Sequence, residues 1–218
     1  MANSIDFYFG SGSPYAWKVW LALEHKALPY RATRMQFDNG DLKTSIFLAI
    51  NPRGQVPTLV DDGFAMYESS AIVEYLEDKY RTSGAPLWPS DVNARAIARR
   101  RTAEILSHID PLNSEIFGLV FGAGDKGVDA DALAKWKIAM AAQLAIADGW
   151  LDQPFLAGPT LSATDFTLYP YVAFLRRIDS RKPDLDLLSL VPPTLAAWMK
   201  RIESLPYFDK TYPPHWRA

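Results

Sequence analysis

The chain has 218 residues, of which 49% are hydrophobic, and its formal net charge is −2. This composition excludes intrinsic disorder and leaves no basic surface for nucleic acid, and the length fits one large domain or two small ones. There is no cysteine, which excludes a disulfide scaffold, a cysteine nucleophile and CxxC redox chemistry.

The amino-terminal residues 1–6 contain no basic segment and no apolar signal core, and no apolar run approaches the length of a membrane span. We therefore expect a cytoplasmic protein with neither a membrane nor a nucleic-acid partner. The three histidines, His25, His108 and His215, are scattered along the chain, and this spacing disfavours a metal site.

Short strand patterns and helical patterns alternate over residues 1–80, which we expect to form a small α/β domain. Residues 5–9 are an apolar, aromatic run that ends at Gly10 and predict a strand. A turn rich in glycine and serine leads into a predicted helix over residues 14–26, and residues 30–37 predict a second strand. Residues 58–60 and 64–67 predict a hairpin, followed by a helix over residues 70–80.

The rest of the chain reads as helical. Residues 81–90 contain one glycine and two prolines and are interpreted as a linker. Between residues 98 and 119 apolar residues recur at steps of four and three, which predicts a long amphipathic helix bent at Pro111. Further helices are predicted from near Asp129 to residue 151, over residues 166–177 behind a capping box at Ser162 and Asp165, and from residue 193. Residues 91–218 are thus expected to form an all-α domain.

Two motifs in the first domain suit the binding of a small peptide. Residues 51–60 read Asn-Pro-Arg-Gly-Gln-Val-Pro-Thr-Leu-Val, so that a Val-Pro step enters a short strand. Residues 67–72, Tyr-Glu-Ser-Ser-Ala-Ile, place a carboxylate and hydroxyls at a helix start. A free backbone edge beside a helix N-terminus suits a peptide that carries a carboxylate and an amine. Glutathione fits this description better than other common metabolites.

With these motifs, the Ser13-Pro14 turn and the capping-box Asp165, the chain resembles the glutathione S-transferase family over nearly its whole length. It is similar to the serine-type, bacterial-like members, and residues 13–19 resemble the tau and zeta classes. The zeta class usually has Ser-Ser-Cys where this chain has Ser-Pro-Tyr, which weakens a zeta assignment. The resemblance implies a thioredoxin-like first domain, an all-helical second domain, glutathione as co-substrate and a homodimer.

Ser13 is the candidate for activating the thiol of glutathione. A free thiol has a pKa of about 8.5, and both a hydrogen-bond donor and a helix N-terminus favour the thiolate. Ser13 can supply the donor and the helix from Pro14 the N-terminus. Ser-Pro is also a common N-cap pair, and the two roles are compatible because a cap uses only a lone pair of the hydroxyl. Ser11 is the rival for this role, and Tyr8 is a weaker one.

The resemblance assigns the other glutathione contacts. It implies a cis Val56-Pro57 bond, with the backbone of Val56 pairing with the cysteinyl part of glutathione like an added strand. Glu68 would accept from the α-ammonium, and Ser69 at the helix N-terminus would bind the γ-glutamyl carboxylate. Gln55 is expected to contact the peptide, and Arg53 either reaches the glycyl carboxylate or stays solvated. Without the resemblance, Pro57 would read as a strand-initiating proline and Glu68 with Ser69 as a plain helix cap.

The leading hypothesis is a transferase that conjugates glutathione to a small hydrophobic electrophile, with a role in detoxification. A glutathione-dependent isomerase, such as maleylacetoacetate isomerase, and a non-catalytic glutathione-binding protein stay open as alternatives. The electrophile pocket is expected between the domains. Its candidates are Tyr15, Phe37, His108, Leu112 and residues 212–216.

A basic run and an acidic run are candidates for a dimer interface. The members are Arg95, Arg99, Arg100 and Arg101 on one predicted helix and Glu74, Glu77 and Asp78 on another. Such runs are usually solvated surface. In a dimer of the implied kind these helices cross near the two-fold axis, where cross-subunit ion pairs would form.

Overall fold

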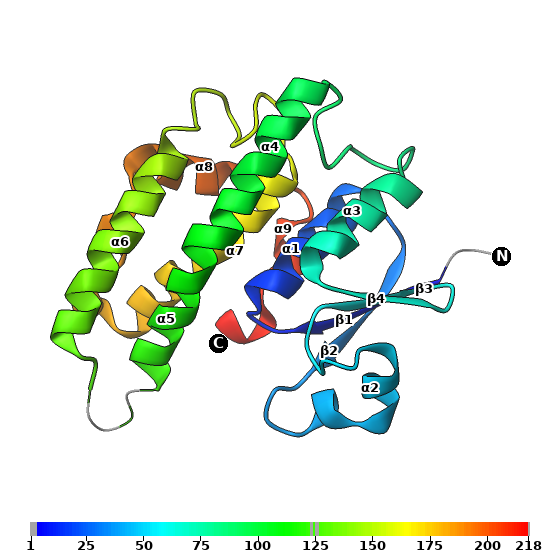
Figure 1. Ribbon diagram of the computed structural model, residues 1–218, viewed down its shortest axis with the longest axis horizontal. Coiled ribbons are helices and arrows are strands. Elements are labelled where there is room, and N and C mark those ends of the chain that lie inside the picture. Colours follow the sequence, from blue (N-terminus) through cyan, green and yellow to red (C-terminus); the bar gives the residue numbers. More distant parts are fainter. Residues whose placement is uncertain (1–3, 123, 125–126, 218) are drawn as a thin grey trace. The chain divides into compact units, whose positions relative to one another are not determined.

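The structure is a computed structural model that describes residues 4–122, 124 and 127–217. These residues divide into two compact units. The first contains the chain up to Trp88 together with the residues from Leu205 onward, and the second contains Pro89–Ser204. Figure 1 traces both units from the blue amino-terminal strand to the red carboxyl-terminal turn.

The first unit is built on a four-stranded mixed sheet with the strand order β2-β1-β3-β4. Its strands are β1 (Ile5–Gly10), β2 (Tyr30–Met35), β3 (Thr58–Asp61) and β4 (Phe64–Tyr67). β1 runs parallel to β2 and antiparallel to β3, which is antiparallel to β4. Parallel neighbours need a crossover connection, and α1 (Pro14–His25) supplies it. This is the thioredoxin-like βαβαββα arrangement, and the predicted hairpin is confirmed.

Helices cover both faces of this sheet. Figure 1 shows α1 and α3 (Ser69–Lys79) on one face and α2 (Ser45–Ile50), with the short turn η1 (Asp41–Lys43), on the other. Successive side chains of a strand point to opposite faces of the sheet, and β1 shows this. The ring centroid of Phe7 lies 6.1 Å from that of Trp20 of α1, whereas the ring centroid of the next residue, Tyr8, lies 5.8 Å from that of Phe47 of α2. The sequence did not predict α2, because Phe47 is its one buried side chain and no apolar periodicity results.

The last residues of the chain pack on α1, within the first unit. They form α9 (Phe208–Thr211) and the turn η6 (Pro214–Trp216). The ring of the buried Trp17 lies 6.1 Å from that of Phe208 and 5.5 Å from that of Trp216. We expected this segment in the helical domain over residues 91–218, whereas the residues from Leu205 onward group with the first compact unit. The reason is the apolar surface that Trp17 offers to aromatic residues about 200 positions later.

The second unit is all helical. Its helices are α4 (Val92–Glu104), α5 (Asp110–Phe121), α6 (Ala130–Asp148), α7 (Ala163–Arg181) and α8 (Pro193–Glu203), with short turns η4 (Pro183–Leu185) and η5 (Leu188–Leu190). The long helix predicted over residues 98–119 is interrupted by a π-helical turn, η2 (Ile105–Ile109). This turn ends two residues before Pro111, which has no N–H to donate to the preceding turn of helix.

The predicted capping box at the start of α7 is confirmed. The carboxylate of Asp165 accepts hydrogen bonds from the backbone N–H and the hydroxyl of Ser162, from the N–H of Leu156 and from the indole of Trp198, at 2.8–3.0 Å. Asp165 is fully buried, and burial raises the pKa of its carboxyl above the ordinary value. Its role in the structure is to join α7, α8 and the segment before α7.

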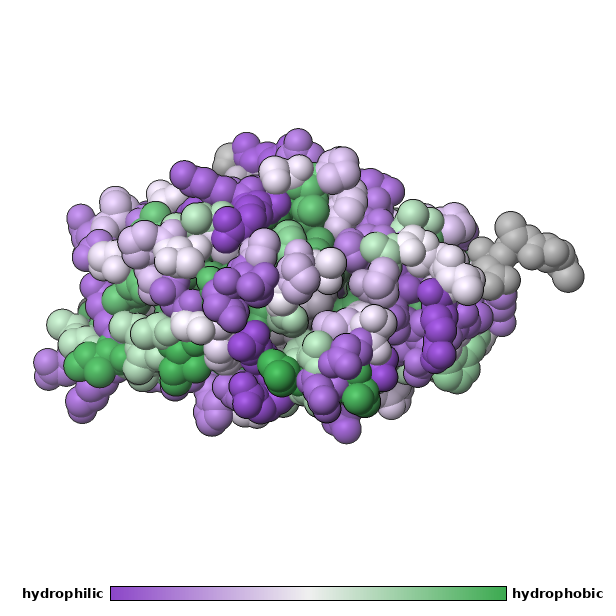
Figure 2. Space-filling view, turned by 90° about the horizontal axis from the view of Figure 1, so that it is seen from above, coloured by the Kyte–Doolittle hydropathy of each residue, from purple (hydrophilic) through white to green (hydrophobic). Residues whose placement is uncertain are grey.

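Within the part of the chain that the structure describes, no helix has the length and apolar character needed to cross a bilayer. The face of the molecule seen in Figure 2 is chiefly hydrophilic, and its hydrophobic side chains lie in small separate groups.

Candidate functional site

Strand register brings the predicted site segments together at one end of the sheet. Tyr8 of β1 pairs with Thr58 of β3, which pairs with Tyr67 of β4. Ser11 and Ser13 follow β1, Val56 and Pro57 precede β3, and Glu68 and Ser69 follow β4. The chain therefore presents all three segments beside the same row of residues. Both α1 and α3 also begin at this end, so their N-termini converge there.

Ser13 is the N-cap of α1. Its Oγ accepts a hydrogen bond from the N–H of Ala16 at 3.3 Å, and Pro14 occupies the first helical position. The cap uses a lone pair and leaves the O–H able to donate elsewhere. The first turn of α1 carries no acidic residue, so no like charge opposes an anion at this helix end.

Ser11 is engaged by a partner that the sequence did not indicate. Its Oγ lies 2.6 Å from Nδ1 of His215, a residue 204 positions away. Tyr8, the weaker rival for the thiol contact, is half-buried against Phe47 on the α2 face of the sheet. Of the three hydroxyls considered, that of Ser13 combines a helix N-terminus with an O–H that its cap leaves available.

The loop of residues 51–57 is held by Asn51. This side chain is 1% exposed and donates to the carbonyl of Gln55 at 2.8 Å and to the hydroxyl of Thr58 at 2.9 Å, while its oxygen accepts from the N–H of Arg53 at 3.0 Å. The Val56-Pro57 bond is cis, as the resemblance implied. Asn51 belongs to the motif at residues 51–60, but the motif alone did not predict its role; an asparagine before a Pro-Arg-Gly turn was the available signal.

The backbone of Val56 lies outside the ladder, because pairing in β3 begins at Thr58. Val56 is half-buried and Pro57 is buried, while Gln55 and Arg53 are exposed. Val56 therefore lies just outside the ladder, at the end of the sheet where β3 begins, and its backbone groups could pair with an extended ligand there. The backbone carbonyl of Gln55 is held by the hydrogen bond from Asn51, and Gln55 is exposed at the surface.

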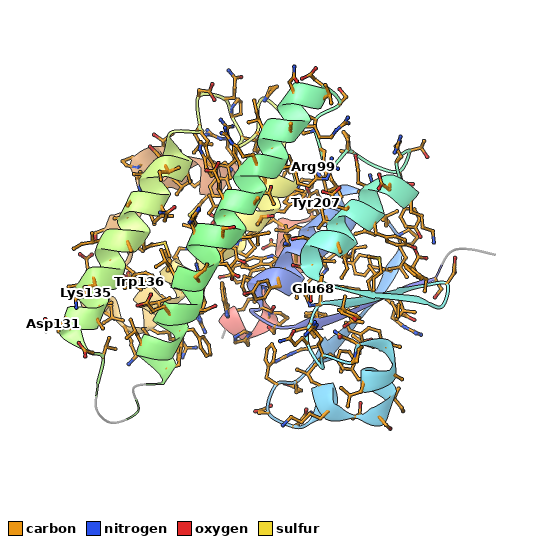
Figure 3. The ribbon with its side chains drawn as sticks, viewed as in Figure 1. Glu68, Arg99, Asp131, Lys135, Trp136 and Tyr207 are labelled. Atoms are coloured by element: carbon orange, nitrogen blue, oxygen red, sulfur yellow. The ribbon has the colours of Figure 1, made fainter. Side chains whose placement is uncertain are left out.

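Glu68 has an unusual backbone at the start of α3. It is the N-cap residue with φ 68° and ψ 105°, and its side chain makes no capping bond. Positive φ is uncommon for a residue with a side chain and clusters at functional sites. Ser69, the first helical residue, is 8% exposed. Glu68, labelled in Figure 3, thus leaves the first N–H groups of α3 without a side-chain cap, and a helix N-terminus of this kind can bind an anion.

Arg53 and Glu68 are near each other. The Arg53 Nε lies 4.0 Å from the Glu68 Oε1, and both side chains are 67% exposed. Such a pair contributes little to stability, so either group can turn to a charged ligand at low cost. Among the described residues, no group of three or more histidine, aspartate or glutamate side chains is placed to hold a metal ion.

Three of the electrophile-pocket candidates lie beside the end of β1 or the β1–α1 loop (residues 11–13). The ring of Phe37, 61% exposed, lies against Gly10, where a Cβ would be 2.2 Å from it. His215 and Trp216 lie against Gly12. His108 and Leu112 belong to the second unit, and their part in a pocket stays a prediction.

Comparison with known proteins gives a consistent result. The model of the glutathione S-transferase N-terminal domain matches residues 12–79, and that of the C-terminal domain matches residues 95–201. Glutathione S-transferase A of Pleuronectes platessa is 27% identical, with coverage of 99% of this chain and 94% of that protein. Glutathione S-transferase 3 of Zea mays is 30% identical, with coverage of 91% and 89%. The crystal structure of a glutathione S-transferase from the Antarctic clam Laternula elliptica is 30% identical with a TM-score of 0.81, covering 99% and 94%.

Proposed function

Because this chain belongs to the glutathione S-transferase family, we propose that it conjugates reduced glutathione to a small hydrophobic electrophile. The thiolate sulfur forms a bond to an electrophilic carbon, and the leaving group departs with the electron pair of the bond that breaks. The observation that carries the proposal is the cap of α1 by Ser13, because this cap uses a lone pair and leaves the O–H able to donate to a thiolate.

The energy that this site must supply is modest. Lowering the thiol pKa from about 8.5 to about 7 corresponds to about 2 kcal/mol. A hydrogen bond to a charged group contributes about 1.5–3 kcal/mol, and a helix N-terminus about 0.3–1 kcal/mol. One donor from Ser13 and the end of α1 are therefore sufficient.

The rest of the glutathione molecule would be oriented by three segments. The backbone of Val56, before the buried Pro57, would pair with the cysteinyl residue. Ser69 and the free N–H groups of α3 would bind the γ-glutamyl carboxylate, and Glu68 its ammonium. Gln55 and Arg53 would contact the peptide and the glycyl carboxylate. Holding the thiol in place converts a bimolecular step into an effectively intramolecular one.

Calorimetry with glutathione tests binding, and turnover assays test the reaction. We expect glutathione to bind at millimolar concentration or below, and a reactive aryl halide to be conjugated. Absence of binding at millimolar glutathione would contradict the proposal. Binding without conjugation would point to a glutathione-binding protein, and isomerisation of a maleyl substrate without conjugation would point to an isomerase.

A cytoplasmic location and a role in detoxification belong to the same proposal. The cytoplasm keeps glutathione in its reduced form, which is the form that the reaction consumes. Conjugation of hydrophobic electrophiles removes reactive compounds from that compartment.

A further inference from the structure

The C-terminal segment (residues 207–217) lies directly on the β1–α1 loop. The Ser11 Oγ is 2.6 Å from Nδ1 of His215. A Cβ at Gly12, which has φ +82°, would lie 2.8 Å from Cε1 of His215 and 3.1 Å from Nε1 of Trp216. The segment thus contacts the loop through a hydrogen bond at one residue and through close packing at the next.

Packing on α1 fixes where His215 stands. The Trp17 indole donates to the hydroxyl of Thr211 at 3.1 Å, and its ring makes an edge contact with Tyr212 at 5.7 Å and with Trp216 at 5.5 Å. Trp17, Thr211 and Trp216 are all buried. Because Trp216 is held in this way, the neighbouring His215 is held beside Ser11, although its own side chain is exposed.

The loop needs such a restraint. Ser11 stands between two glycines, and glycine loses more conformational freedom on ordering than any other residue. One turn bond, from the N–H of Ser13 to the carbonyl of Gly10 at 3.1 Å, closes the loop. The hydrogen bond between the side chains of Ser11 and His215 is a second restraint on the loop of residues 11–13. It is made two residues before Ser13.

We propose that His215 is a positioning residue of the thiol site: through Ser11 it fixes the β1–α1 loop so that the Ser13 hydroxyl and the N-terminus of α1 meet the thiol of glutathione. This inference rests on the proposed function and extends the site to a segment near the other end of the chain. It also gives Ser11 a role distinct from that of Ser13. A misplacement of about 1 Å at a reacting group is enough to lower a rate strongly.

The test measures the pKa of the bound thiol by pH titration of the ultraviolet absorbance of the thiolate, together with the Kd for glutathione and the split between kcat and KM. In His215→Ala we expect the bound thiol pKa to rise by about 0.5–1 unit and kcat to fall about 5- to 10-fold, the size of one lost hydrogen bond. The Kd should stay within about twofold, because Val56, Glu68 and Ser69 are untouched.

Four further variants separate positioning from a general loosening of the segment. His215→Asn keeps a hydrogen-bonding atom near the position of Nδ1 and should restore most of the pKa and kcat. Ser11→Ala should reproduce the His215→Ala effects, and the double variant should be no worse than either single one. Arg217→Ala removes contacts of Arg217 with Asp209 and Tyr212 inside the same segment and should behave like the wild type.

A bound thiol pKa in His215→Ala equal to that of the wild type would overturn the inference, and so would full additivity of the Ser11→Ala and His215→Ala effects. If the wild type does not bind glutathione, the proposed function fails instead. In that case nitrogen NMR of the free protein still tests the tie. Ser11→Ala should shift the His215 imidazole resonances, and unshifted resonances would overturn it.

Discussion

Ser13 has two roles that a mutation removes together, so its test needs a variant that keeps the hydroxyl. Ser13→Ala loses the cap on Ala16 and the proposed donor to the thiolate. We expect kcat/KM with an aryl halide to fall about 10- to 100-fold, the cost of a hydrogen bond to a charged group. The apparent pKa of the pH–rate profile should rise toward that of free glutathione.

Ser13→Thr is the matched control, because threonine retains both a cap and a donor. It should keep most of the activity. If Ser11→Ala abolishes activity while Ser13→Ala remains near the wild type, the thiol contact belongs to Ser11.

Asn51 gives a second prediction at this scale, for stability. Its three hydrogen bonds are buried, so Asn51→Ala leaves buried polar groups without partners. We expect the free energy of unfolding to fall by about 2–3 kcal/mol in urea titration. Asn39→Ala is the control, because Asn39 makes one exposed bond, to the N–H of Asp41, and should change stability by less than about 0.5 kcal/mol. Equal losses in both variants would contradict the role given to Asn51.

At the residue scale, the sequence predicted which residues belong to the candidate site better than it predicted which residues they contact. Residues 51–60 and 67–72 could be singled out because their turn and cap chemistry is local. The tie between Ser11 and His215 could not be predicted, since no local pattern connects residues 204 positions apart. The positive φ of Glu68 could not be predicted either, because a positive φ is uncommon for a residue with a side chain.

Among the elements, β3 and α3 are joined through one carboxylate. Asp61 of β3 is 1% exposed and accepts from Tyr75 at 3.0 Å, Lys79 at 2.8 Å and Tyr80 at 2.6 Å. Burial alone would raise the pKa of this carboxyl, but the bonds from Lys79 and the two tyrosines bring it below its ordinary value. Asp61 therefore favours the folded state when it is ionised.

The sign of the pH dependence follows from that lowered pKa. The stabilisation that the ionised Asp61 contributes is present above the pKa of about 3.9 that an aspartate has in the unfolded chain. It is lost as the pH falls through the lower pKa of Asp61 in the folded protein. Asp61→Asn should lower the free energy of unfolding by about 2 kcal/mol at pH 7, and the difference from the wild type should shrink as the pH falls below about 4. Urea titrations at several pH values measure it. Asp38→Asn, at an exposed position, should show no such loss, and a pH-independent difference for Asp61→Asn would contradict the linkage.

Elements with a strong local pattern were predictable, and elements without one were not. The capping box of α7 and the hairpin of β3 and β4 follow from adjacent residues. β2 ends at Met35, two residues before its predicted end, because the parallel pairing with β1 stops at Gly10. α2 was missed because its six residues have little buried surface.

On the scale of the whole molecule, some members of the two charged runs have partners within the subunit. Glu77 accepts from Lys26 and from the N–H of Leu87, and Arg101 donates to the carbonyl of Leu156. Both side chains thus have partners within the subunit, and cross-subunit ion pairs of the two runs stay a prediction. Among exposed apolar residues, α4 carries Val92 and Ile97, which suits an interface.

We expect light scattering at micromolar protein to give twice the subunit mass of 24.4 kDa. Ile97→Asp should shift the protein toward monomer, because a charge in an apolar interface is costly. Ile138→Asp on α6, where the side chain is 75% exposed, should leave the mass unchanged. A monomeric wild type would refute the dimer.

The order of an α/β unit before a helical unit was predictable from periodicity alone, because strands and helices differ in period. The boundaries at residues 80 and 91 stay predictions. The placement of residues 205–217 was not predictable. A run rich in aromatic residues indicates that the segment is buried, but it does not indicate which helix the segment packs against.

That placement has a consequence for synthesis of the protein. Nascent domains ordinarily fold in order as they leave the ribosome. Here Trp17 is released early, yet the rings that cover it, Phe208, Tyr212 and Trp216, are translated after the entire second unit. The first unit must wait for them with part of its core exposed, and it completes after the unit that follows it in the chain.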